Sequence, residues 1–329
     1  MHARILSCSI SVVALAAALM ALPCGTRPAL AQTYPDRPVK IVVPIGPGGS
    51  YDIVGRTVAD ALSKRLGQPV VAENKPGAGT VVGTQFVAAS PADGYTLLVG
   101  GLSNIVFNAS LYSKLQHDPM KEFTPVAIVF GFPYLLVGRK DLPYNTLTEV
   151  VEAAKKEPNK LSMANAGVGT GQHLVAAALA QSTGAKFLDV PYKGAQLAYP
   201  DILAGRVDFF VDSFSAALPH VQNGSVKAIA VAGPKRNPQL PNVPTMAEAG
   251  VKGFDIESWI GIFAPAKTPP EALARLRKEV RAVIPELKDA YAKIGGTTIE
   301  MSEAETGPFI QKEYDAWTKV IKDSGIKLD

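Results

Sequence analysis

The feature that most restricts the fold of this chain is a junction that occurs three times: a short apolar run, a glycine-rich loop and a helical pattern. The first glycine loop, residues 44–52, lies between the β-rich run 39–43 and an amphipathic segment that extends to Leu66. The same order returns at residues 74–80 and 165–171. Short β-rich runs that alternate with helical segments predict an α/β fold with largely parallel strands.

The glycine loops also indicate a chemical preference. A loop that leads into a helix directs several backbone N–H groups, and the positive end of the helix dipole, toward one point. Anions bind well at such a point. No catalytic motif lies near any of the three loops, so the pattern predicts a protein that binds carboxylates without transforming them.

The N-terminal segment, residues 1–31, is expected to be a signal peptide. Arg4 precedes an apolar run at 10–22 that is short for a membrane span, and Ala-Leu-Ala at 29–31 fits a cleavage site of small residues. A membrane anchor and a lipoprotein with lipidated Cys24 are the alternatives, although Pro23 stands where a lipoprotein has a small residue. We expect an exported, periplasmic protein that begins at Gln32.

The composition argues against some classes of binding partner and against cysteine-based chemistry. Both cysteines, Cys8 and Cys24, lie in the predicted signal peptide, so the mature chain is expected to have no disulfide, thiolate nucleophile or cysteine metal site. The 33 basic and 29 acidic residues nearly balance, and no basic run stands out, which argues against nucleic acid as a partner. We expect a soluble monomer without a metal or a cofactor.

Two long β-like runs suggest how the chain is divided. The run 126–138 is interrupted by Pro133, and the run 254–264 ends at Pro265. We interpret them as two crossings between lobes. This predicts a first lobe of residues 32–131 and 260–329 and an inserted second lobe of residues 132–259. A ligand of such a protein belongs in the cleft between the lobes, at the carboxyl ends of the strands.

Signatures of catalysis and of nucleotide binding are missing. His117, His173 and His220 are far apart and fit no metal-binding pattern, and no G-x-S-x-G turn nominates a serine nucleophile. The second glycine loop matches neither a dinucleotide fingerprint nor a P-loop. Asp52 is interpreted as the N-cap of the following helix rather than as a catalytic acid. Asp212 is interpreted as a helix cap or a water-holding group, because its charge would repel a carboxylate ligand.

Several motifs occur in the order of a known family. Tyr-Pro-Asp-Arg-Pro at 34–38 precedes Pro-x-x-Pro-Gly-Gly-x-x-Asp at 44–52 and Leu-Gly-Gln-Pro-Val-Val-x-Glu-Asn-Lys-Pro-Gly-Ala-Gly at 66–79. They are followed by Pro-Ala-Asp-Gly-Tyr-Thr-Leu-Leu at 91–98, Val-Pro-Tyr-Lys-Gly at 190–194, Gly-Arg-Val-Asp at 205–208 and Pro-x-Val-Pro-Thr at 241–245. From residue 32 onward the chain resembles the Bug family, the periplasmic solute receptors of tripartite tricarboxylate transporters.

The resemblance implies a two-lobed Venus-flytrap receptor that delivers a carboxylated solute to membrane permease subunits. The ligands of the family include di- and tricarboxylates, acidic amino acids and aromatic carboxylates. The first two glycine loops are expected to hold one carboxylate through amides and ordered waters, while loops of the second lobe close over it. The candidate ligand-binding residues are Gly48, Gly49, Ser50, Tyr51, Asp52, Gly77, Ala78, Gly79, Thr80, Ser103, Ala166, Gly167, Gly169, Thr170, His173, Tyr192, Lys193, Asp212 and Phe214.

Two other functions remain open from the sequence. One is a receptor that presents its solute to a membrane sensor instead of a permease. The other, from a different class, is a secreted α/β hydrolase, against which the missing nucleophile and metal motifs count.

Three further expectations concern how the site works. Ligand should close the lobes about a hinge at residues 130–133 and 259–263. A β-branched residue in place of Gly49 should weaken binding at least about tenfold, because it would disturb the backbone that aims the loop amides. Tyr51, together with Phe130, Phe132 and Phe214, is expected to stack on a planar ring, which favours an aromatic carboxylate over citrate.

Overall fold

The computed structural model describes residues 34–112 and 114–324, and those from Pro35 onward belong to one compact unit. The predicted signal peptide lies outside the described residues. The strands are β1 Val39–Val43, β2 Val70–Asn74, β3 Thr96–Gly101, β4 Phe123–Arg139, β5 Ser162–Asn165, β6 Leu188–Pro191, β7 Phe209–Ser213, β8 Val226–Ala232, β9 Glu257–Pro265 and β10 Thr297–Thr298.

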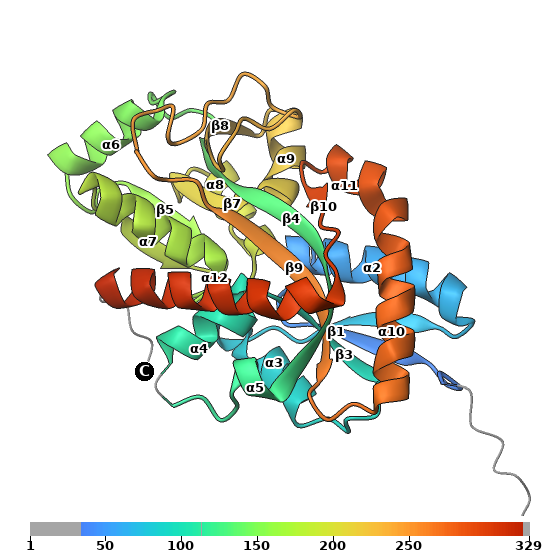
Figure 1. Ribbon diagram of the computed structural model, residues 1–329. Coiled ribbons are helices and arrows are strands. Elements are labelled where there is room, and N and C mark those ends of the chain that lie inside the picture. Colours follow the sequence, from blue (N-terminus) through green and yellow to red (C-terminus); the bar gives the residue numbers. More distant parts are fainter. Residues whose placement is uncertain (1–33, 113, 325–329) are drawn as a thin grey trace, which may run out of the picture. The chain divides into compact units, whose positions relative to one another are not determined.

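The helices alternate with these strands, as the repeated junction predicts (Figure 1). They are α2 Ser50–Leu66, η1 Ala78–Thr80, α3 Val81–Ala88, η2 Leu102–Phe107, α4 Asn108–Leu111, α5 Pro119–Glu122, α6 Leu147–Lys156, α7 Gly171–Thr183, η3 Ala195–Leu197, α8 Tyr199–Leu203, α9 Phe214–Gln222, α10 Pro270–Val283, η4 Ile284–Leu287, α11 Lys288–Lys293 and α12 Glu303–Ser324.

The described strands form one ten-stranded sheet in the order β2-β1-β3-β9-β4-β7-β5-β6, with β8 and β10 also paired to β4. Pairing is parallel at both ends, where β1 lies between β2 and β3 and β5 lies between β6 and β7. The middle of the sheet, around β9 and β4, is antiparallel. The α/β architecture with parallel strands flanked by helices is therefore confirmed, and the two central strands are the exception to parallel pairing.

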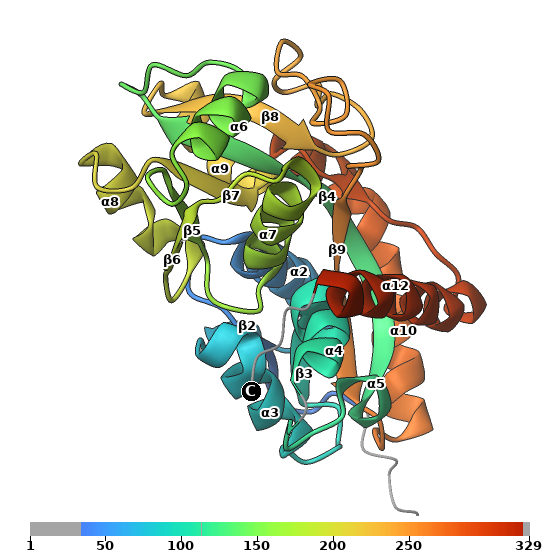
Figure 2. The ribbon, with the colours of Figure 1, turned by 90° about the vertical axis from the view of Figure 1, so that its left-hand side faces the viewer.

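Strand β4 links two groups of strands. Its residues 123–133 pair with β9, whereas its residues 134–139 pair with β7 and β8. We call β1, β2, β3, β9 and β10 with their helices the first half, and β5 to β8 with theirs the second half (Figures 1 and 2). The exchange of partners falls beside Pro133, within the run that the sequence analysis interprets as a crossing. The lobe boundaries themselves remain a prediction.

Local sequence explains several of the helix ends. Helix α2 begins after Gly49 and ends at Gly67, which adopts the left-handed conformation with φ 67°. Helix α6 begins with a capping box, in which Thr146 accepts from the N–H of Glu149 and the Glu149 carboxylate accepts from the N–H of Thr146. The π-helix η2, whose six residues are all buried, was not predicted.

The core lies between the first half of the sheet and the C-terminal helix. It includes Leu98 and Trp259, with Ile310 of α12 packed into the same cluster. The ring of Trp317 is partly buried and packs edge-on against Phe107, with centroids 4.8 Å apart. Helix α12 therefore covers the first half through an apolar face.

Candidate functional site

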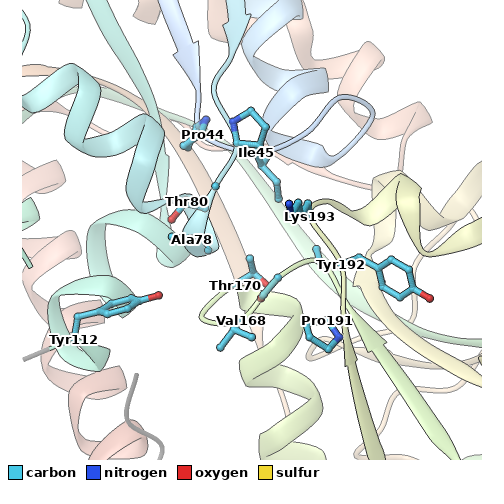
Figure 3. A pocket seen from close by; sticks show the side chains of 15 residues that line it. Pro44, Ile45, Ala78, Thr80, Tyr112, Val168, Thr170, Pro191, Tyr192 and Lys193 are labelled. Carbon is cyan, nitrogen blue, oxygen red and sulfur yellow. The ribbon is translucent and has the colours of Figure 1, made fainter. Parts of the chain in front are cut away.

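A cavity of about 320 Å³ opens where loops from the two halves meet, at the carboxyl ends of the parallel strands. It is lined by residues 44–45, 76–80, 166–168 and 191–193, together with Tyr112 and Thr170. Figure 3 shows Ala78 and Thr80 on one side and Val168 and Thr170 on the other. Parallel strands bring their loops to one edge of a sheet, and ligands of open α/β sheets bind there.

The second glycine loop lines this cavity with residues 76–80. In the described part of the chain, the N–H groups of Gly77, Ala78 and Gly79 form no backbone hydrogen bond outside their own short helix. The loop has an unusual backbone, since φ is positive at Gly77, Ala78, Gly79 and Thr80. Such strain persists only where the surroundings support it. The Asn108 amide, which donates to the Thr80 hydroxyl at 3.0 Å, is one such support.

The first glycine loop is stabilised within its own half. The Asp52 carboxylate accepts from the N–H of Gly48 at 2.9 Å and from Asn74 at 2.9 Å, and it forms an ion pair with Arg56. Burial by itself would raise the pKa of Asp52, but these hydrogen bonds outweigh it and hold the pKa below its ordinary value. The N-cap interpretation was therefore wrong in detail. Gly49 is the N-cap, while Asp52 lies in the first turn and binds the preceding loop.

The conformational argument for Gly49 was also wrong. Gly49 has φ −80° and ψ 168°, which any residue adopts, and a Cβ added at this position would lie 4.0 Å from its nearest neighbouring atom. The glycine that needs its freedom is Gly48, with φ 81°. The error arose because adjacent glycines cannot be distinguished by a motif.

Residues of the first half also bond across to the second half. The hydroxyls of Ser50 and Ser215 are 2.6 Å apart, and the Ser103 hydroxyl accepts from the N–H of Gly171 at 3.0 Å. The N–H of Ser103 donates to the Tyr51 hydroxyl at 3.3 Å, and burial raises the pKa of Tyr51 to about 12. Ser50 and Ser103 thus join the two halves, whereas Tyr51 bonds within the first half, and none of the three lines the cavity.

The third glycine loop uses its amides internally. The N–H of Gly167 donates to Asn165 at 2.8 Å, and the N–H of Gly169 donates to Nδ1 of His173 at 3.3 Å. The Thr170 hydroxyl donates to the Gly167 carbonyl at 2.6 Å. Burial lowers the pKa of His173 despite the nearby Asp189 carboxylate, so the imidazole serves as a neutral acceptor within the loop. This loop shapes the cavity wall more than it offers free donors.

Lys193 supplies the cation of the cavity lining. Its side chain is exposed, and no carboxylate in the described part of the chain lies within ion-pair distance of it. The neighbouring Tyr192 points its ring away from the cavity (Figure 3) and donates from its hydroxyl to Asp201 at 2.6 Å. Tyr192 therefore contributes mainly backbone to the lining.

Asp212 and Phe214 are fully buried in the second half. Asp212 accepts from Tyr199 at 3.0 Å and from the Ser213 N–H at 2.7 Å, and burial raises its pKa to about 6 in spite of these bonds. Phe214 is fully buried and approaches Gly295. Neither residue lines the cavity.

The aromatic side chains proposed for ring stacking are placed elsewhere. Phe130 and Phe132 are buried and stack on each other at 5.5 Å, and Phe130 packs edge-on against Tyr291. Tyr112, which the sequence analysis missed, points its ring toward the cavity (Figure 3). It lies shortly after the π-helix and belongs to no recognised motif, so nothing in the local sequence marks it.

Two general findings complete the description of the site. Within residues 34–112 and 114–324, no three His, Cys, Asp or Glu side chains are grouped so that they could hold a metal ion. None of the helices that the structure describes is both long and apolar enough to cross a membrane.

The chain is similar to several known proteins. Residues 54–326 match the family model described as the tripartite tricarboxylate transporter family receptor. The periplasmic binding protein BugD is 35% identical, with a TM-score of 0.85 over 89% of this chain and 99% of BugD. R. palustris Rpa4515, solved with adipate, is 32% identical, with a TM-score of 0.86 over 89% of this chain and 99% of that one. MatC of Rhodopseudomonas palustris, solved with malate, is 32% identical, with a TM-score of 0.81 over 88% and 100%.

Proposed function

Because the chain belongs to the tripartite tricarboxylate transporter receptor family, we propose that it is a periplasmic receptor that captures a small carboxylate and delivers it to membrane permease subunits. The observation that carries the proposal is the cavity whose lining contains both residues 77–79, with N–H groups free of backbone hydrogen bonds outside their short helix, and the cation of Lys193. Relatives solved with adipate and with malate support the carboxylate.

The magnitudes are consistent with a useful affinity. Hydrogen bonds to a charged group contribute roughly 1.5–3 kcal/mol each. Three amide bonds, with a smaller contribution from the exposed Lys193, would therefore supply roughly the −8 kcal/mol of a micromolar complex, less the cost of ordering the ligand and the two halves.

The lining favours an aliphatic carboxylate. Apart from Tyr112 and Tyr192, whose ring points away (Figure 3), the cavity is lined by proline, glycine, alanine, valine, isoleucine, threonine and lysine side chains. This surface suits a short hydrocarbon chain with a carboxylate at each end better than the three carboxylates and hydroxyl of citrate. The preference for an aromatic ring has lost its basis, because Tyr51, Phe130, Phe132 and Phe214 do not line the cavity.

A thermal-shift screen tests the function. Adipate, malate, glutamate, citrate, nicotinate and terephthalate are added separately to the full chain. A ligand at about 100 times its Kd stabilises the folded state by about 2.7 kcal/mol, which raises the melting temperature by about 5 °C for a protein of this size. A flat response to every carboxylate would contradict the proposal. Co-purification with permease subunits, rather than with a sensor, tests delivery.

A further inference from the structure

Gln196, in the short helix η3 of the second half, forms hydrogen bonds with two separate elements. Its Nε2 donates to the carbonyl oxygen of Gly48 in the first glycine loop at 3.3 Å. Its Oε1 lies 3.2 Å from Nε2 of His220 in helix α9. One half-buried side chain thus connects the first half to the interior of the second half.

The contact with Gly48 is close because Gly48 has no side chain. A Cβ at Gly48 would lie 2.6 Å from Cγ of Gln196, and its φ of 81° also favours glycine. The N–H of Gly48 is held by Asp52 of its own half at 2.9 Å. The loop is therefore fixed from both sides, by Asp52 through its N–H and by Gln196 through its carbonyl.

The residues behind Gln196 are themselves well supported. The His220 ring stacks on Tyr199 with centroids 3.6 Å apart and an interplanar angle of 14°. The Tyr199 hydroxyl donates to the buried Asp212 carboxylate at 3.0 Å. Because Tyr199 and Asp212 are buried, the side chain that reaches Gly48 is anchored in the second half rather than free to rotate in solvent.

Gln196 does not line the ligand cavity, so its effect on ligand must pass through the loop it holds. That loop leads directly into helix α2, whose first residue, Ser50, meets Ser215 of the second half at 2.6 Å. Both contacts therefore join the start of α2 and its loop to the second half. Opening of the halves would break both.

We propose that Gln196 is a positioning residue that holds the first glycine loop against the second half in the closed protein and thereby slows release of the bound carboxylate. The inference deepens the proposed function and rests on it for the identity of the ligand. It assigns to a residue outside the cavity a role in how long the ligand stays bound.

Three variants separate the two hydrogen bonds of Gln196. Gln196→Glu keeps the size of the side chain and an acceptor for His220, but it places a carboxylate oxygen against the Gly48 carbonyl. Gln196→Ala removes both bonds, and His220→Phe retains a ring to stack on Tyr199 while removing the bond to Gln196. The matched control is Gln311→Ala, which removes an amide hydrogen bond to Asp315 on the exposed face of α12.

The first measurement is the dissociation rate of adipate, or of malate if adipate does not bind, together with the melting temperature of the ligand-free full chain. A net hydrogen bond corresponds to roughly a twofold to tenfold change in an equilibrium. We expect Gln196→Ala to raise the dissociation rate by about that factor, Gln196→Glu to raise it more, and His220→Phe to raise it less. The association rate should stay close to that of Gln311→Ala, and the melting temperature should fall by no more than the few degrees that one or two lost hydrogen bonds cause.

The second measurement is hydrogen–deuterium exchange of residues 46–50 in the ligand-free full chain. Gln196→Glu should exchange faster there than the wild type, and Gln311→Ala should not. An unchanged dissociation rate in Gln196→Glu would overturn the proposal. If the wild type binds no carboxylate, the proposed function fails. The exchange measurement still tests Gln196, because equal exchange of residues 46–50 in Gln196→Glu and in Gln311→Ala would overturn its positioning role.

Discussion

The substitution Gly79→Ala would test whether the contact between residues 77–80 and 166–168 is present when ligand is bound. Gly79 lies in the second glycine loop with φ 56°, opposite Val168 of the second half. A Cβ at this position would lie 2.0 Å from the Val168 carbonyl oxygen. Because the backbone of residue 79 fixes the position of its Cβ and the oxygen belongs to the backbone of Val168, neither atom can rotate out of the way.

The size of the effect follows from this geometry. Real Cβ atoms essentially never approach another heavy atom within 3.0 Å, so the two loops must separate by about 1 Å before the methyl group fits. Such a displacement lengthens at least one charge-assisted hydrogen bond to the ligand, which contributes about 1.5–3 kcal/mol. We therefore expect the Kd of Gly79→Ala for adipate to rise at least tenfold, or by about 1.4 kcal/mol.

The matched control is Gly205→Ala. Gly205 has a similar φ of 74°, but a Cβ added there would have no atom within 4 Å. Both variants should lose about 1–2 kcal/mol of stability from the left-handed backbone, while only Gly79→Ala should lose affinity. Calorimetric titration with adipate and denaturant unfolding measure the two effects. If Gly79→Ala bound adipate as tightly as Gly205→Ala, the contact between residues 77–80 and 166–168 would not belong to the bound state.

Three further predictions concern charge and capping. Burial raises the pKa of Asp212 from 3.8 to about 6, so the folded state binds this proton more tightly than the unfolded state. The ionised carboxyl therefore destabilises the fold above pH 6, and this destabilisation is relieved as the pH falls toward 3.8. From pH 7.5 to pH 5 the wild type should gain about 1.4 kcal/mol of unfolding free energy relative to Asp212→Asn, and a difference that does not change with pH would contradict this. Lys193→Gln should raise the Kd for adipate about threefold, less so at high salt, as titrations at two salt concentrations will show. Thr146→Ala should cost about 1 kcal/mol in denaturant unfolding through the lost capping box, with adipate affinity unchanged.

Much of the fold could be predicted from local sequence. The β-branched run 39–43, the glycine at the end of α2 and the capping box at Thr146 each specify their element through interactions among neighbouring residues. The order of motifs likewise leads to the family, because it depends only on residue identity and spacing. Less local features were missed, such as the π-helix η2, whose six residues are all buried within the fold.

The site was predicted only in part, because motifs do not show which backbone amides remain free. Three glycine loops look alike in the sequence, yet Asp52 and His173 occupy amides of the first and third loops, while the amides of residues 77–79 form no backbone hydrogen bond outside their short helix in the described part of the chain. Likewise, an aromatic residue near a motif either lines a cavity or packs in the core, and Phe214 packs in the core.

The sequence by itself determined most strands, the glycine loops and several helix ends, since these depend on periodicity and on φ preferences, and it predicted an anionic ligand from the helix dipole. Only the tertiary structure decided which loop offers its amides, why Gly48 and not Gly49 needs its glycine, and that Gln196 reaches Gly48 at a separation of 148 residues. Those outcomes depend on which side chains from distant segments lie close enough to bond to a given loop. The sequence does not show this, because the segments come together only when the sheet forms.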